Sequence, residues 1–170
     1  MKYCVIIPTY NNELTLDALI SGVLGHTRNV IIVNDGSTDS TSSILERYKE
    51  LKIISYSPNR GKGYAIRKGL KAANDAGFTH AITIDSDGQH FPEDIGSFVE
   101  KADESPDSLL VGARTLDPAK VSRGSLFANR FSNFWFRVIT GVKLTDTQTG
   151  FRLYPLEQTR NMKFFTRKYE

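Results

Sequence analysis

The stretch HAITIDSDGQHFPEDI, residues 80–95, decides the fold class and raises the question of function. It begins with the apolar run Ala81–Ile84, typical of a buried strand, and then places two carboxylates one residue apart, Asp85 and Asp87. Alternate residues at a strand end point to the same side, so both carboxylates can face one ion. Because like charges repel and burial removes their hydration, the pattern predicts a positive partner, and a hard divalent cation fits it; a solvated Asp-Gly turn is the alternative.

Four other short apolar runs accompany this strand, and each is followed by a polar turn. They are Tyr3–Ile7, Val30–Val33, Ile53–Tyr56 and Leu109–Val111. Apolar residues at helical spacing follow the runs, as after the first at Leu16, Leu19, Ile20, Val23 and Leu24. Nearly continuous apolar strands that alternate with helices predict an α/β fold, with a mostly parallel sheet flanked by helices on both faces.

Composition limits the class of protein. The chain has 170 residues, of which 39% are hydrophobic and 24% charged, as expected for one domain with a real core. Its net charge of +3 is too small to predict nucleic-acid binding but would not oppose an anionic substrate or a membrane surface. The single cysteine, Cys4, lies in an apolar run and is predicted to be a buried structural thiol, which fits a reducing cytoplasm. No apolar stretch approaches the roughly eighteen residues of a membrane span, so we expect a soluble or peripheral protein.

The polar segments that follow the strands are predicted to form one crevice, because ligands of such sheets bind beyond the carboxyl ends of the strands. These segments are Pro8–Glu13, Asn34–Asp39, Ser57–Gly63, Asp85–His90 and Gly112–Arg114. Arg60 and Lys62 can approach a phosphate through flexible backbone, although an ordinary basic turn would look the same. Asp35 can accept hydrogen bonds from a ribose or a base, with an Asx-type turn as the alternative.

Four motifs together resemble the family 2 glycosyltransferases, which have the GT-A nucleotide-sugar-binding fold. In chain order they are VIIPTYNNELTL from residue 5, VNDGSTDST from 33, NRGKGYAIRKGL from 59 and ITIDSDGQHFPEDI from 82. The form DSDGQHFPEDI and the later DTQTGFRLY, residues 146–154, especially resemble dolichyl- or polyprenyl-phosphate sugar (mannose) synthases. The resemblance covers roughly residues 3–155.

The resemblance implies a set of site residues and a reaction. Pro8, Tyr10, Glu13 and Asp35 would hold the nucleoside, Asp85 and Asp87 would bind Mg²⁺ or Mn²⁺ with Gln89 beside them, and Arg114 would approach the diphosphate. The implied activity is metal-dependent, inverting transfer of a hexose from a GDP- or UDP-sugar. One departure is Asn34, where many relatives carry a first acid before Asp35.

The acceptor decides the rest of the chemistry. A sugar hydroxyl needs a general base, for which Asp146 is the obvious candidate, whereas a lipid phosphate carries its own ionised oxygen and needs cations such as Arg152. We expect a polyprenyl (dolichyl-type) phosphate acceptor, with Asp87, Asp146 and Arg152 as candidate catalytic residues. The alternatives are a transferase acting on a sugar hydroxyl in polysaccharide or glycan synthesis, or a donor-binding domain without full activity. IDSDG also resembles the nucleophile motif of haloacid-dehalogenase-like phosphatases, but that motif usually lies on the first strand.

A helical segment between these motifs carries both cations and aromatic rings. Arg123, Arg130 and Arg137 are spaced seven residues apart, and Phe127, Phe131, Phe134, Trp135 and Val138 form a stripe. The arginines indicate either a solvated face or an anion site, and the stripe either packs in the core or lies on a membrane surface.

We expect one glycosyltransferase catalytic domain, with residues 1–115 as the nucleotide-sugar and metal half and 116–170 as the acceptor-side half. The chain ends without a cap or turn signal, so we expect a truncated C-terminus. We expect a cytoplasmic location, with peripheral attachment to the inner face of a membrane as the alternative.

Overall fold

The computed structural model describes residues 1–113 and 123–160, and for residues 123–128 it describes the backbone only. The strands are β1 (Tyr3–Thr9), β2 (Val30–Asn34), β3 (Lys52–Ser55), β4 (His80–Thr83), β5 (Leu110–Val111) and β6 (Arg152–Pro155). The helices are α1 (Leu16–Leu24), α2 (Thr41–Leu45), α3 (Lys62–Asp75), α4 (Ile95–Glu104), α5 (Arg123–Thr140) and α6 (Leu156–Thr159), with short 3₁₀ turns at Glu46–Tyr48 and Pro92–Asp94.

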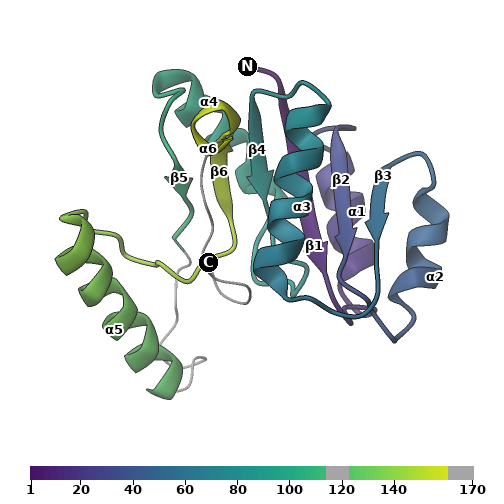
Figure 1. Ribbon diagram of the computed structural model, residues 1–170, viewed down its shortest axis with the longest axis horizontal. Helices are drawn as coiled ribbons and strands as arrows, with labels where there is room; N and C mark the ends of the chain where they lie inside the picture. Colours follow the sequence, from purple (N-terminus) through teal and green to yellow (C-terminus); the bar gives the residue numbers. More distant parts are fainter. Residues whose placement is uncertain (114–122, 161–170) are drawn as a thin grey trace.

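The described strands form one sheet in the order β3-β2-β1-β4-β6-β5 (Figure 1). β1 pairs in parallel with β2 and β4, and β2 with β3, so the carboxyl ends of four neighbouring strands lie at one edge. β6 runs antiparallel to both β4 and β5. The predicted mostly parallel α/β sheet is confirmed, and β6 is an addition that the apolar pattern did not predict. Its residues alternate between buried and half-buried, because only one face of this short strand is fully covered.

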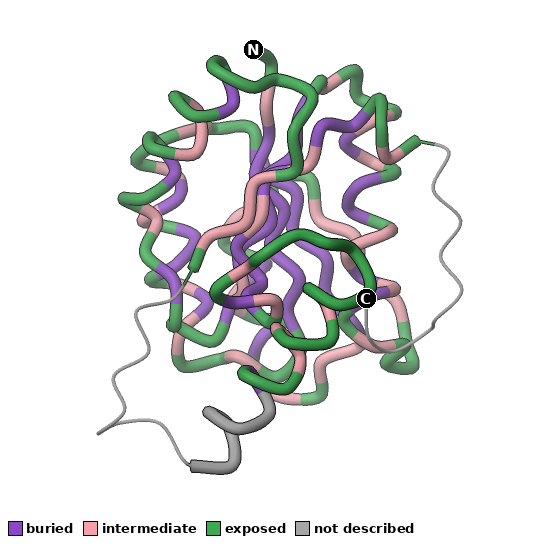
Figure 2. The backbone as a smooth tube through the Cα atoms, turned by 90° about the vertical axis from the view of Figure 1, so that its left-hand side faces the viewer, coloured by how far each residue is buried: buried purple, intermediate pink, exposed green. Residues whose placement is uncertain are grey.

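Helices cover both faces of the sheet, as predicted. Leu16, Ile20 and Val23 of α1 and Ile95 and Ala102 of α4 pack against one face. Ala65, Leu70 and Ala73 of α3 pack against the other face with Cys4, Ile6, Ile31 and Val33. Burial is densest in the central strands, as Figure 2 shows. Cys4 is fully buried as predicted, and burial raises the pKa of its thiol to about 12.

A glycine sets how closely α3 approaches the sheet. A Cβ atom at Gly69 would lie 2.4 Å from Cγ2 of Ile6, a distance that no packed side chain tolerates. The close approach places the N-terminus of α3, with the loop before it, beside the carboxyl ends of β1 and β2. The packing of α3 therefore positions Lys62 for the site described below.

Helix α5 stands apart from the layered body in Figure 1, on the side of the sheet where β5 and β6 lie. Among the described residues, no helix combines the length and the hydropathy needed to cross a bilayer. Arg114 lies outside the described residues, as do the side chains of Arg123 and Phe127.

Candidate active site

A cleft of about 250 Å³ opens at the carboxyl ends of β1, β2 and β4. It is lined by Pro8, Thr9, Tyr10, Asn12, Asp35, Asn59, Lys62, Ala65, Asp85, Ser86 and Asp87. Four of the five predicted polar segments contribute to it, because the strands that deliver them are neighbours in the sheet. Four of the five segments therefore meet in one crevice, as the sequence predicted, and the described part of the fifth segment, residues 112–113, does not line it.

Asp35 anchors the loop between β3 and α3. Its side chain is only 2% exposed, Oδ1 accepts a hydrogen bond from the backbone N–H of Arg60 at 2.8 Å, and Oδ2 accepts from the N–H of Gly61 at 2.8 Å. Oδ2 also accepts from Nδ2 of Asn59 at 3.0 Å. Burial and then the interaction with Asp35 raise the pKa of Tyr56, which keeps that phenol protonated. With these three hydrogen bonds, the Asp35 carboxylate fixes the loop that borders the cleft.

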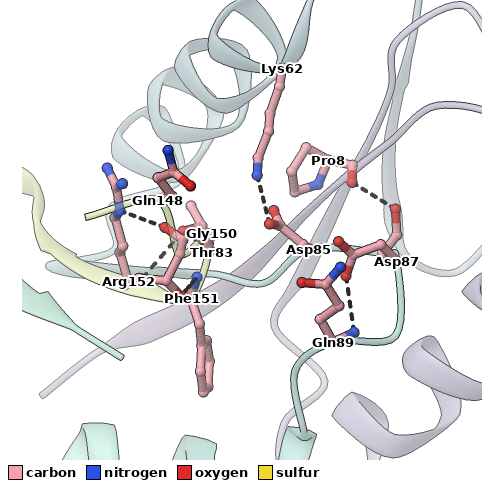
Figure 3. Close-up of polar contacts among 12 residues, drawn as sticks. Pro8, Lys62, Thr83, Asp85, Asp87, Gln89, Gln148, Gly150, Phe151 and Arg152 are labelled. Atoms are coloured by element: carbon pink, nitrogen blue, oxygen red, sulfur yellow. Dashed lines mark hydrogen bonds and ion pairs between the residues drawn. The ribbon is translucent and has the colours of Figure 1, made fainter. Parts of the chain in front are cut away.

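Asp85 and Asp87 face the same cleft, as their spacing predicts (Figure 3). Oδ2 of Asp85 lies 2.6 Å from Nζ of Lys62, while its Oδ1 is buried without a hydrogen-bond partner among the described residues. Asp87 is exposed, and its Oδ1 accepts a hydrogen bond from the backbone N–H of Gln89 at 3.0 Å. Ser86, between them, turns toward β1 and donates to the carbonyl of Pro8 at 3.0 Å.

This arrangement fits a hard divalent cation. Two carboxylates line one cleft, and one of their oxygens is buried and unpartnered among the described residues. No group of three or more Asp, Glu, His or Cys side chains suited to a metal occurs in the described part of the chain. A cation held by two carboxylates and completed by water and substrate phosphate is a common Mg²⁺ arrangement. Gln89 does not line the cleft, and the ring of His90 packs 5.5 Å from that of Phe151.

Gly150 lies directly against the carboxylate of Asp85, a contact that the sequence did not predict. A Cβ atom at Gly150 would lie 2.0 Å from Oδ2 of Asp85. The hydroxyl of Thr83 in β4 donates to the carbonyl of Gly150 at 2.8 Å and holds the glycine in place. The loop before β6 is thereby fixed against the acid at the end of β4. A glycine in the sequence signals only a turn or a close approach, without naming the partner.

A second cavity of about 570 Å³ lies beside the cleft and shares Lys62 with it. It is lined by Lys62, Gly63, Ile66, Thr83, Ser132, Thr147, Gln148, Thr149, Gly150, Arg152 and Tyr154. Arg152 donates from Nε to the carbonyl of Thr149 at 2.9 Å and from Nη2 to that of Thr147 at 2.8 Å. These bonds use two of the five guanidinium N–H groups, so Arg152 both shapes the wall and keeps donors for an anion.

Asp146 lines neither cavity. Its side chain is 2% exposed, and Oδ1 accepts hydrogen bonds from Nδ2 of Asn129 in α5 at 2.8 Å and from the N–H of Gln148 at 3.2 Å. Asn133, one turn further along α5, donates to the carbonyl of Thr145 at 2.7 Å. Asp146 thus joins α5 to the wall of the second cavity.

The other predicted site residues lie around the cleft without lining it. The carboxylate of Glu13 accepts a hydrogen bond from the N–H of Ser40 at 2.9 Å. The guanidinium of Arg60 lies 5.0 Å from the ring centroid of Tyr64 and donates to its hydroxyl at 3.0 Å. Asn34 is buried, accepts from the N–H of Ser37 at 3.0 Å and donates to Ser42 at 3.2 Å. The amide of Asn34 thus both donates and accepts at this position.

Comparison with known sequences points to one family. The family model described as "Glycosyl transferase family 2" matches residues 4–159. A UDP-N-acetylglucosamine–dolichyl-phosphate N-acetylglucosaminyltransferase of Methanococcus voltae is 30% identical, over 88% of this chain and 68% of its own length. A polyprenol monophosphomannose synthase of Mycolicibacterium smegmatis is 27% identical, over 90% of this chain and 61% of its own. A dolichyl-phosphate beta-glucosyltransferase of Dictyostelium discoideum is 25% identical, and the chain spans 55% of its length.

Solved structures of similar fold include S. aureus TarS 1–349 in complex with UDP-GlcNAc, with a TM-score of 0.64 and 23% identity over 95% of this chain and 47% of that one. Glucosyl-3-phosphoglycerate synthase of Mycobacterium tuberculosis, in complex with Mn²⁺, UDP and phosphoglyceric acid, has a TM-score of 0.65 and 18% identity over 92% of this chain and 56% of that one. At these identities the likeness establishes the fold, and the predicted GT-A architecture is confirmed.

Proposed function

The chain belongs to glycosyl transferase family 2 and is a glycosyltransferase, and from that premise we propose that it transfers a hexose from a GDP- or UDP-sugar to a polyprenyl phosphate. In this proposal residues 1–115 bind the donor and the metal, residues 116–170 face the acceptor, and the reaction takes place at the inner face of a membrane. The chain spans only part of its curated relatives, so the proposal concerns the whole native protein.

The donor is assigned to the smaller cleft. Tyr10 is 45% exposed there and offers its ring to a base, while Asp35 and the loop that it anchors would face the ribose or base. Asp85 and Asp87 would hold Mg²⁺ or Mn²⁺ on the diphosphate side. The bound cation would neutralise charge on the leaving nucleoside diphosphate. The ammonium of Lys62 adds fixed positive charge at the same place, where charge develops as the bond to the sugar breaks.

The acceptor phosphate is assigned to the second cavity. An ionised oxygen of the acceptor phosphate forms the new bond to the anomeric carbon of the sugar. The bond from that carbon to the diphosphate oxygen breaks, and its electron pair stays on the diphosphate. No proton needs to leave the nucleophile, so cations serve better than a base. Lys62 and Arg152 supply those cations, and Asp146 remains a buried hydrogen-bond acceptor for α5.

One observation carries this choice of acceptor: the second cavity is lined by Arg152 and Lys62 and not by Asp146. The test measures sugar transfer by the full-length protein, with polyprenyl phosphate and with free oligosaccharide as acceptors, across a panel of GDP- and UDP-hexoses. Arg152→Ala should lose at least about tenfold in transfer to the lipid phosphate, because a charge-assisted contact is removed. Asp146→Asn should keep most of the activity, because an amide oxygen can still accept from Asn129.

The reverse pattern would contradict the proposal. An indispensable Asp146 together with transfer to a sugar hydroxyl would identify a polysaccharide or glycan transferase. Donor binding without transfer to any acceptor would indicate a donor-binding domain.

A further inference from the structure

The outward side of helix α5 is apolar and exposed. The exposed fractions are 56% for Phe131, 59% for Phe134, 47% for Trp135, 57% for Val138 and 79% for Ile139. Within the part of the chain that the structure describes, these residues therefore do not pack in the core. Single exposed apolar side chains are ordinary on proteins, but a row of them along one helix marks an interaction surface.

The inward side of α5 is held by the loop that leads into β6. Asn129 is buried and donates to Asp146 at 2.8 Å, and Oδ1 of Asn133 accepts from the N–H of Thr147 at 2.9 Å. Residues 129 and 133 are one helical turn apart and share a face. The polar bonds thus fix the rotation of α5 about its axis, and that rotation turns the aromatic side chains outward.

Cations lie along one edge of the apolar face. Arg130 and Arg137 are exposed, and neither makes an ion pair within the described part of the chain. At about 100° per residue, these arginines, seven residues apart, align on one side of the helix, between the polar face and the apolar face. Lys143 follows just after the helix and is also exposed. Long basic side chains in this position can bury their stems while their charges reach an anionic surface.

We propose that this face of α5 docks on the surface of an anionic lipid bilayer, with the aromatic side chains in the headgroup region and Arg130 and Arg137 against lipid phosphates. An apolar stripe edged by basic residues is the pattern of a helix that lies in the interface plane. Cations alone would bind weakly, and apolar side chains alone would not distinguish a bilayer from another protein. Docking requires neither donor nor acceptor, so it can hold even if the proposed acceptor is wrong.

The geometry gives docking a consequence for the site. The side of α5 opposite the apolar face is bonded to residues 145–147, and Ser132 and Thr147 line the second cavity. A bilayer bound to the outer side of α5 therefore lies one helix thickness, about 10 Å, from the wall of that cavity.

The chain contains one tryptophan, and it lies on this face, so its fluorescence reports docking directly. The full chain is titrated with vesicles of phosphatidylcholine alone and of phosphatidylcholine mixed with phosphatidylglycerol, some containing brominated lipid. We expect the Trp135 emission to shift to the blue and to be quenched by bromine with the mixed vesicles, and to change much less with phosphatidylcholine alone.

Matched variants separate this face from general stickiness. Phe134→Ser/Ile139→Ser should weaken vesicle binding at least about tenfold, because two apolar side chains lose their burial. Leu14→Ser/Phe91→Ser removes two side chains that are 92% and 66% exposed elsewhere and should leave binding unchanged. Arg130→Gln/Arg137→Gln should weaken binding to anionic vesicles about tenfold, whereas Arg28→Gln/Lys49→Gln, with the same change of net charge, should have little effect.

Three results would overturn the proposal. The first is that Trp135 fluorescence does not respond to anionic vesicles. The second is that each control variant loses as much vesicle binding as the α5 variant with which it is matched. The third is sedimentation showing a dimer in which Trp135 is already shielded without lipid, because the face would then contact a second copy of the chain. Circular dichroism and thermal melts of each variant establish that lost binding is not lost folding.

Discussion

The smaller cleft and the second cavity share Lys62 but are built in different ways. The smaller cleft is made by residues that directly follow neighbouring parallel strands, and its acids are fixed by backbone N–H groups and by Lys62. One wall of the larger cavity is the loop before β6, which side chains of α5, Arg152 and Thr83 hold through hydrogen bonds. The strand ends position one site, whereas side chains distant in the sequence position the other. Changes in the two regions should therefore have different effects.

The largest expected effect belongs to the smaller cleft, to which we assign the donor. Asp87→Ala should abolish metal-dependent binding of a nucleoside diphosphate, with an affinity loss of about a hundredfold or more. The reason is that a side chain that contacts the metal directly contributes more to metal affinity than one that only contacts such a ligand. The fold should remain, since Asp87 is exposed. Isothermal calorimetry with and without Mg²⁺ or Mn²⁺ measures the loss, with Glu100→Gln as a control on an exposed acid. Unchanged metal-assisted binding in the Asp87 variant would contradict the proposal that Asp87 binds the metal.

Gly150→Ala tests the contact that joins the two regions. The added methyl group would overlap the Asp85 carboxylate, so we expect a loss of about 1–3 kcal/mol in the free energy of unfolding, with weaker donor binding. The matched control is Gly96→Ala in α4, where a Cβ atom meets nothing within 4 Å. Denaturant unfolding and calorimetry compare the two variants. Equal behaviour would mean that the loop does not press on Asp85.

Asp35→Ala probes the anchor of the loop between β3 and α3. The change leaves the N–H groups of Arg60 and Gly61 without their acceptor, and we expect nucleoside and complete donor to bind about tenfold more weakly. Asp35→Asn should lose less affinity for both ligands, because one side-chain oxygen remains to accept a hydrogen bond. Binding of free nucleoside and of sugar nucleotide is compared by calorimetry. A loss confined to the sugar-bearing donor would place Asp35 elsewhere in the mechanism.

The smallest effect is expected at Lys62, and it should appear in both regions. Lys62→Ala should raise the KM for the donor and for polyprenyl phosphate by up to about tenfold each and should lower kcat, because one exposed cation is removed from both cavities. Lys68→Ala on the same helix removes a cation that lines neither cavity and serves as the control. An increase for one substrate alone would show that the cavities do not share this residue in solution.

Sequence motifs predicted part of the lining of the smaller cleft, because those residues follow the strands directly. Pro8, Tyr10, Asp35, Asp85 and Asp87 each lie at or just beyond the end of an apolar run, and the parallel pairing brings those ends together. The same reasoning placed Glu13, Arg60 and Gln89 near the cleft but could not tell that they do not line it. That distinction depends on side-chain direction, since the guanidinium of Arg60 turns to Tyr64.

The sequence by itself determined the alternation of strands and helices, the edge of the sheet at which the smaller cleft opens, and the paired acids at the end of β4, because these follow from periodicity within short segments. Only the tertiary structure decided that β6 joins the sheet antiparallel, that Gly150 lies against Asp85, that Asp146 is buried under α5, and that the aromatic side of α5 faces outward. These features depend on contacts between residues far apart in the chain, such as Thr83 with Gly150, 67 residues later. Local patterns do not encode such contacts, because they arise only when the packed sheet brings the segments together.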